Sequence, residues 1–166
     1  QQGHTSTAFG AKSVFAEDVD GDGDVDVLSA SSYDHTFAWY ENNGSENFTK
    51  RVITSSANGA KTVYAVDLDG DGDMDVLSAA QGDDVIAWHE NDGSENFTSH
   101  VITSSADGVH SAHAADLDGD GDVDVLSASQ IDNKVAWYEN LGGGVFGPQQ
   151  VISDQGLAPR DVFAKD

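Results

Sequence analysis

Short segments of alternating apolar and polar residues, separated by turn-forming residues, run the length of the chain. In the first part they predict strands over 14–16, 26–30, 37–41 and 48–53, because alternation with a period of two is typical of half-buried antiparallel strands. Clusters of Ser, Asp, Asn and Gly over 31–34 and 42–47 predict the turns between strands. The sequence has no sustained 3.6-residue periodicity, so we expect no helices.

This pattern repeats. The acidic segment that begins at Asp18 returns at Asp67 and at Asp116, 49 residues apart each time. Other landmarks with the same spacing are Trp39, Trp88 and Trp137, and Phe48, Phe97 and Phe146. Four short strands in a unit of roughly 40–50 residues are typical of a propeller blade. We therefore predict an all-β fold of four-stranded antiparallel β-propeller-type blades, forming part of a larger propeller or assembly.

The repeats make up one repeat domain over residues 1–166. The first repeat covers about 8–56, the second about 57–105 and the third about 106–155. Residues 156–166 match the start of a fourth repeat. Three blades would leave an apolar face open at each end, so we expect the partners to be neighbouring repeats or copies of the chain itself.

A nine-residue acidic loop in each repeat is the strongest candidate for chemistry. Calcium takes about six to eight hard oxygen ligands in a flexible cage. Asp side chains at loop positions 1, 3, 5 and 9 are expected to converge on one point, Gly at position 6 allows the sharp turn, and the carbonyl of position 7 adds a ligand. The predicted ligands for about three calcium ions, one in each loop, are Asp18, Asp20, Asp22, Asp24 and Asp26; Asp67, Asp69, Asp71, Asp73 and Asp75; and Asp116, Asp118, Asp120, Asp122 and Asp124.

The alternative is a merely solvated acidic turn, but five Asp residues within nine positions repel one another unless a cation is present. An EF-hand would need a carboxylate at position 12, where Ser29, Ser78 and Ser127 stand, and flanking helices. A nonapeptide β-roll would repeat the motif every nine residues. Magnesium prefers fewer carboxylates and more water. The remaining interpretation is a calcium loop within a β-hairpin.

The charge and amino-acid composition of the chain exclude several classes of partner and site. The chain has 7 Lys+Arg and 30 Asp+Glu, giving a formal net charge of −23. This excludes an extended nucleic-acid-binding surface, which needs clustered cations, and argues against docking on anionic lipid. Cys is absent, which excludes disulfides and thiolate sites. No apolar run approaches the length of about 18 residues that a membrane-spanning segment needs, so we expect no membrane insertion.

The repeated motifs resemble those of the FG-GAP/VCBS-type repeat family, which includes the calcium-loop blades of integrin α-subunit propellers and many secreted bacterial proteins. The resembling segments are the acidic run over 67–79, the Ala-Trp-His-Glu-Asn segment over 87–91 and the Asn-Gly-Ser turn over 43–48. The resemblance covers essentially the whole chain. It implies a propeller with the calcium loop between the first and second strands of each blade, and an extracellular or cell-surface setting. It does not imply one activity.

Three further sets of residues are candidates. Tyr40, His89 and Tyr138 follow the repeated Trp and are predicted to offer faces for a sugar ligand, the alternative being that they pack in the core like the Trp. Asn43, Asn47 and Asn96 begin glycosylation sequons on predicted turns, or are simply repeated turn residues.

His110 and His113 have the spacing His-x-x-His, but strand residues three apart point to opposite faces, which argues against zinc. His110 aligns with Lys12, Lys61 and Arg160 of the other repeats.

No unique acid, base or nucleophile stands apart from the repeats, so we expect no enzymatic activity. The leading hypothesis is a calcium-binding extracellular module for adhesion or for binding glycans or surface proteins. A second is a structural subunit of an extracellular filament or surface assembly. A third is an accessory propeller of a secreted polysaccharide-active enzyme.

Overall fold

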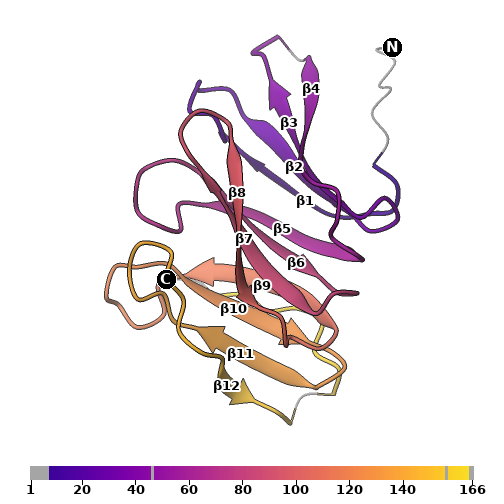
Figure 1. The fold of residues 1–166 in the computed structure, drawn as a ribbon, viewed down its shortest axis with the longest axis vertical. Helices are drawn as coiled ribbons and strands as arrows, with labels where there is room; N and C mark the ends of the chain where they lie inside the picture. Colours follow the sequence, from indigo (N-terminus) through magenta and orange to yellow (C-terminus); the bar gives the residue numbers. More distant parts are fainter. Residues whose placement is uncertain (1–7, 46, 156, 165–166) are drawn as a thin grey trace.

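The computed structural model describes residues 8–45, 47–155 and 157–164, which form three four-stranded sheets (Figure 1). Each sheet is a simple antiparallel meander in sequence order. The first consists of β1 (Ala11–Glu17), β2 (Asp26–Ser31), β3 (Thr36–Asn42) and β4 (Phe48–Thr54). The second consists of β5 (Ala60–Val66), β6 (Asp75–Ala80), β7 (Val85–Asn91) and β8 (Phe97–Thr103). The third consists of β9 (Val109–Ala115), β10 (Asp124–Ser129), β11 (Lys134–Tyr138) and β12 (Gln150–Ser153).

The predicted strands of the first repeat all lie inside β1–β4, and the described residues contain no helix. The all-β, propeller-type blade architecture is therefore confirmed. Because the described residues contain no helix, no segment among them meets the length and apolarity needed for a membrane-spanning helix.

Consecutive sheets pack face to face, and this packing forms the core. Leu28 and Trp39 are paired across β2 and β3 and point toward the second sheet, where they pack with Val63 and Val76. The second sheet repeats the arrangement toward the third, with Leu77 and Trp88 of β6 and β7 in one cluster with Val109 and Val125. The side chains of Trp39 and Trp88 are 1% and 4% exposed. The packing alternative is thus confirmed for these two residues.

The aromatic residues predicted to contact a ligand are buried, which corrects that prediction. Tyr40, His89 and Tyr138 are 9%, 3% and 0% exposed. The reason for His89 and Tyr138 is that the third strand of their blades is covered by the preceding sheet on the face opposite the Trp. His89 accordingly lies near Phe37 of the preceding sheet, and its ring nitrogens hydrogen-bond with the hydroxyls of Ser78 and Ser99. Tyr40 lies on the uncovered face of the first sheet, where Lys50 lies over its ring.

The first strands of the sheets, β1, β5 and β9, lie next to one another. One aromatic ring from each forms a column, with centroids 4.4 Å apart between Phe15 and Tyr64 and 5.0 Å apart between Tyr64 and His113. Phe163, near the end of the described chain, continues the column at 4.8 Å from His113. Residues 160–164 therefore lie against β9, in the place that the strand of a following repeat would take.

Two sheet faces have no sheet covering them among the described residues. Val14 of β1 is 69% exposed, whereas the residues in the same position of the next two repeats, Val63 and Ala112, are 2% and 3% exposed. At the other end, Trp137 is only half-buried, unlike Trp39 and Trp88. Coverage by a neighbouring sheet, rather than the sequence of a strand, decides how far these positions are buried.

Burial of His89 predicts a dependence of stability on pH. Burial lowers the pKa of His89 to about 4, whereas an unfolded His titrates near 6.5. Between these values only the unfolded chain binds the proton, so the free energy of unfolding should fall by about 2 kcal/mol from pH 7 to pH 5 through this group. His89→Tyr, which places the residue of the other two repeats, should remove this part of the pH dependence.

Urea unfolding of both proteins at the two pH values, with calcium held constant, measures the difference. His100→Gln, at a more exposed histidine paired with Glu90, is the control. It should retain most of the dependence of the parent, because burial, and to a smaller extent the charge of His100, lowers the pKa of His89. Equal pH dependence in His89→Tyr and the parent would contradict the assignment.

Candidate metal centres

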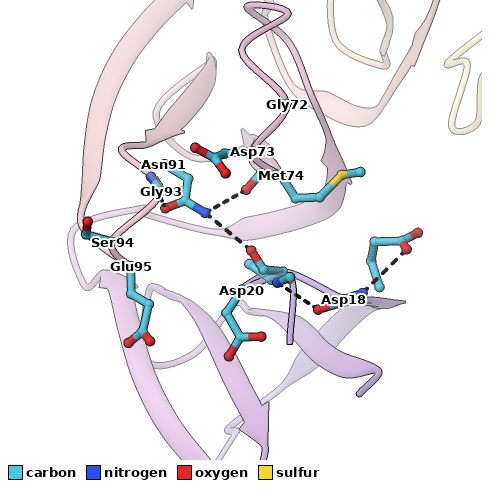
Figure 2. Close-up of a pocket in the computed structure, with 12 residues that line it drawn as sticks. Asp18, Asp20, Gly72, Asp73, Met74, Asn91, Gly93, Ser94 and Glu95 are labelled. Carbon is cyan, nitrogen blue, oxygen red and sulfur yellow. Dashed lines mark hydrogen bonds between the residues drawn. The ribbon is translucent and has the colours of Figure 1, made fainter. Parts of the chain in front are cut away.

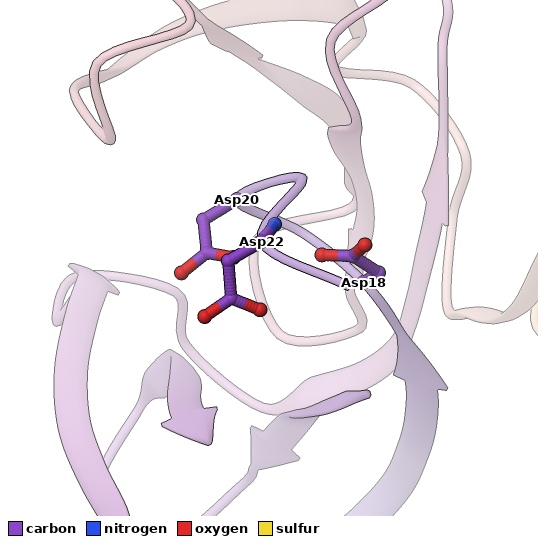
Figure 3. Close-up of side chains that lie close together, drawn as sticks. All are labelled: Asp18, Asp20 and Asp22. Atoms are coloured by element: carbon purple, nitrogen blue, oxygen red, sulfur yellow. Dashed lines mark hydrogen bonds between the residues drawn. The ribbon is translucent and has the colours of Figure 1, made fainter. Parts of the chain in front are cut away.

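The acidic loops connect the first and second strands of each sheet, as expected of calcium loops in hairpins. In the first loop, oxygen atoms of Asp18, Asp20 and Asp22 all lie within 4.8 Å of one another (Figure 3). The second loop brings together the equivalent residues, Asp67, Asp69 and Asp71. In the third loop the converging set is Asp116, Asp118 and Asp124. Each loop thus gathers three carboxylates, the donor type that calcium prefers.

Hydrogen bonds inside each loop hold the carboxylates in this arrangement. Both carboxylate oxygens of Asp18 accept backbone N–H groups, from Gly21 at 2.8 Å and from Gly23 at 2.9 Å. The carboxylate of Asp20 accepts the N–H of Asp22. The other two loops repeat these bonds. The glycines at loop positions 4 and 6 have φ between 73° and 100° in all three loops, a region that L-residues rarely adopt.

The Asp at position 9 has a different role in the structure. Asp26, Asp75 and Asp124 are fully buried. One oxygen of Asp75 accepts the N–H of Leu68 at 2.9 Å and the other accepts the N–H of Asn91, also at 2.9 Å. The carboxylate thereby ties the start of the loop to the end of the third strand. In the first two loops it lies outside the converging set, so only in the third does the structure bring position 9 together with positions 1 and 3.

The side chains at position 7 point away from the converging carboxylates. The side chains of Asp24 and Asp73 lie against Gly44 and Gly93 in the turn between the third and fourth strands, where an added Cβ would collide with a carboxylate oxygen. Asp122 lies near Gly142 of the corresponding turn. This orientation fits a role for position 7 through its main-chain carbonyl rather than through its side chain.

The electrostatics of the loops favour a bound cation. Burial, opposed in part by the N–H bond each accepts, raises the pKa of Asp20, Asp69 and Asp118 above the usual range, and the neighbouring Asp residues raise it further. Burial also raises the pKa of Asp75 to about 7. A divalent cation among these groups would reverse both effects by stabilising the charged carboxylates. The charge, oxygen chemistry and spacing of the loops therefore fit calcium.

A buried Asn at the end of the third strand links consecutive loops. The side-chain amide of Asn91 donates to the carbonyl of Met74 in its own loop and to the carbonyl of Val19 in the preceding loop (Figure 2). Asn140 does the same, donating to Val123 and, at 2.8 Å, to Leu68 of the preceding loop. Sequence reasoning did not single out this Asn, although its recurrence at 42, 91 and 140 was the available signal.

These bonds form one chain across the three sheets. Val19 donates its N–H to Asp26 and accepts the amide of Asn91, whose own N–H donates to Asp75. Asp75 in turn accepts the N–H of Leu68, whose carbonyl accepts the amide of Asn140. The metal candidates are thus built into the junctions between blades.

Comparisons with known proteins agree with this architecture. The family model described as FG-GAP-like repeat matches the chain three times, over residues 18–78, 67–127 and 116–166. The chain belongs to the FG-GAP-like repeat family. Each match begins at the first Asp of an acidic loop, and the first two extend into the second strand of the next blade.

Among solved structures, the chain is similar to one described as showing specific recognition of non-reducing terminal N-acetylglucosamine by an Agrocybe aegerita lectin. The TM-score is 0.63 at 22% sequence identity, and the match covers 86% of this chain and 39% of the lectin chain. The likeness supports the propeller-type fold, and this FG-GAP-like chain spans about two fifths of that lectin's length. A search of curated proteins found no match.

Two cavities lie at the junctions between the FG-GAP-like blades, and the first of them is mainly polar. The first, of about 350 Å³, lies between the first acidic loop and the turn after β7, and its lining includes Asp18, Asp20, Asn91, Ser94 and Glu95 (Figure 2). The second, of about 390 Å³, lies between the second and third loops. The repeat therefore places both a candidate cation site and a hollow at each junction.

The predicted glycosylation residues lie on the surface. Asn43, Asn47 and Asn96 are exposed in the turns between the third and fourth strands of the first two blades. The side-chain amide of Asn96 donates to both carboxylate oxygens of Asp92, and that of Asn47 donates to the carbonyl of Ser45. Exposure is a requirement for modification, and the modification itself stays a prediction.

The link made by Asn91 leads to a measurable prediction. Asn91→Ala would leave the buried carbonyl of Val19 and the partly buried carbonyl of Met74 without their donor, which should lower the free energy of unfolding by about 1–3 kcal/mol. Asn42→Ala is the matched control, because Asn42 donates to Val25 of its own loop and has no preceding loop to contact among the described residues. Urea unfolding should show the larger loss for Asn91→Ala, and an equal loss in both variants would contradict the inter-blade role.

Proposed function

We propose that this chain is a calcium-stabilised, non-catalytic binding module that acts outside the cell. The observation that carries the proposal is the threefold repetition of an acidic loop whose carboxylates converge at the blade junctions. Membership in the FG-GAP-like repeat family supports the calcium and the extracellular setting. The lectin-like fold neighbour supports a binding role.

Calcium would neutralise a concentration of charge that otherwise opposes folding. Each loop contains five Asp residues, so the three loops carry half of the 30 acidic residues of the chain. The proposed side-chain ligands are positions 1, 3 and 5 in the first two loops and positions 1, 3 and 9 in the third, with the carbonyl of position 7 added in each loop. Because the metal binds the folded loop and not the open chain, each site would stabilise the fold by about 2.7 kcal/mol at calcium a hundredfold above its dissociation constant.

Calcium binding can be tested with two substitutions of equal charge in one loop. We expect calorimetry to give about three calcium ions per parent chain, and Asp71→Ala, which removes the ligand oxygens, to lose one ion and melt at a lower temperature in calcium. Asp73→Ala should retain all three, because that side chain points toward Gly93. Unchanged melting of the parent in excess chelator would contradict the proposal.

We propose that the ligand of the module is a glycan and that it binds in the cavity between the first and second blades. The buried positions of Tyr40, His89 and Tyr138 remove the predicted stacking faces, whereas this cavity presents carboxylate, hydroxyl and amide groups that suit sugar hydroxyls. Its volume of about 350 Å³ is within the usual range for small-molecule sites. Recognition of terminal N-acetylglucosamine by the fold neighbour makes terminal sugars the first ligands to test.

A blocking substitution tests the cavity. Ser94→Tyr should fill it, whereas Ser45→Tyr changes the equivalent turn of the first blade, which has no preceding acidic loop among the described residues. On a glycan array in calcium, we expect the parent and Ser45→Tyr to bind the same sugars and Ser94→Tyr to bind at least about tenfold more weakly, a loss of roughly 1.4 kcal/mol. Equal binding by Ser94→Tyr would place the ligand elsewhere, and a silent array for the parent would overturn the glycan assignment.

A further inference from the structure

A basic cavity stands out in this acidic protein. It has a volume of about 410 Å³ and lies where the first strands of the three blades meet residues 160 and 161. Each repeat contributes a basic residue and a small hydroxyl residue next to it. The lining residues are Lys12 and Ser13, Lys61 and Thr62, His110 and Ser111, and Arg160 and Asp161.

The cations in this cavity have no carboxylate partner. Among the described residues, Lys12, Lys61 and Arg160 form no salt bridge, whereas Arg51 and Lys134 do. Lys12 lies over the ring of Tyr33, 5.6 Å from its centroid. In a chain with 30 Asp+Glu against 7 Lys+Arg, three cations thus gather in one cavity without a salt bridge.

The charged groups also act on one another. Burial lowers the pKa of Lys61, and the positive charges of Lys12 and Arg160 lower it further. Burial and Lys61 lower the pKa of His110 in the same way. The carboxylate in the cavity, Asp161, accepts a hydrogen bond from the hydroxyl of Ser111. Three permanent positive charges therefore face one negative charge, which leaves the cavity with an excess of positive charge.

Fold geometry brings these residues together from distant parts of the chain. The hydroxyl of Thr62 donates to the carbonyl of His110, and Nδ1 of His110 hydrogen-bonds with the carbonyl of Arg160. These contacts join the second and third repeats and the segment after them. The cations of the cavity repel one another, and a bound anion would offset this repulsion. Its attraction to the cations would be stronger here than in bulk water, because the cavity partly excludes water.

We propose that this cavity binds a small organic molecule that carries an oxyanion, a carboxylate or a sulfate. Lys12, Lys61 and Arg160 would supply the charge, and the hydroxyl of Ser13 would supply a neutral donor. The volume exceeds what an inorganic ion needs and leaves room for a group of about the size of one sugar ring. This site is separate from the acidic loops and does not rest on the glycan proposal.

Titration calorimetry at constant ionic strength tests the site with inorganic sulfate, glucuronate and glucose. We expect sulfate or glucuronate to bind the parent in a one-to-one ratio. Lys61→Gln and Lys12→Gln should each raise the dissociation constant about tenfold or more, because each removes a charged donor. Lys134→Gln removes the same charge from a salt bridge elsewhere and should leave binding unchanged.

The binding results either support or overturn the proposed site. Binding of glucuronate alone assigns a carboxylate and binding of sulfate alone assigns a tetrahedral oxyanion, and either supports the site. Absence of binding to the parent, an equal loss in Lys134→Gln, or glucose binding as tightly as glucuronate would overturn it. Because Lys12 is exposed, Lys12→Gln keeps the test valid even if Lys61→Gln unfolds the protein.

Discussion

A four-stranded blade that is apolar on both faces cannot cover both faces by itself. Each blade therefore depends on its neighbour, and the positions of the core follow from this constraint. Leu28 and Trp39 are buried by the second sheet and Leu77 and Trp88 by the third. Where a face meets no further sheet, the same repeat positions become exposed, as Val14 does. The stability of such an array is the sum of the blades and of the junctions between them.

The junctions combine apolar packing with a polar chain that runs through the loops. A buried Asp joins the loop to its own third strand, and a buried Asn joins that strand to the preceding loop. An acidic loop that opened by charge repulsion would release both connections. A cation that neutralises an acidic loop would thus stabilise more than its own hairpin. It would also stabilise the hydrogen bonds that hold adjacent blades together.

Much of this architecture could be predicted from the sequence because repetition makes the signal unusually clear. The 49-residue step fixed the blade unit, and the four strands of the first repeat fell where alternation placed them. The acidic loops were found with their turn glycines and their place in a hairpin. Position 9 was expected to be a ligand on spacing alone, which does not reveal that its carboxylate is already bonded to two backbone N–H groups.

Other features could not be predicted from the sequence, because they depend on contacts between residues that are far apart along the chain. Burial of His89 depends on the sheet before it, and a single strand pattern does not show whether both faces of a blade are covered. The contact of Asn91 with Val19 joins residues 72 positions apart. The basic cavity gathers Lys12, Lys61 and Arg160, which the alignment of repeats placed in one column without showing that the column closes around a hollow.

Amide hydrogen exchange with and without calcium tests the central claim that the loops and the blade junctions form one unit. The backbone amides of Asn91 and Asn140, which lie outside the loops and donate to Asp75 and Asp124, report on the junctions, and those of β6 and β10 report on the cores. We expect removal of calcium to accelerate exchange at all of these amides together. Faster exchange confined to the acidic loops, with the junction and core amides unchanged, would contradict the account.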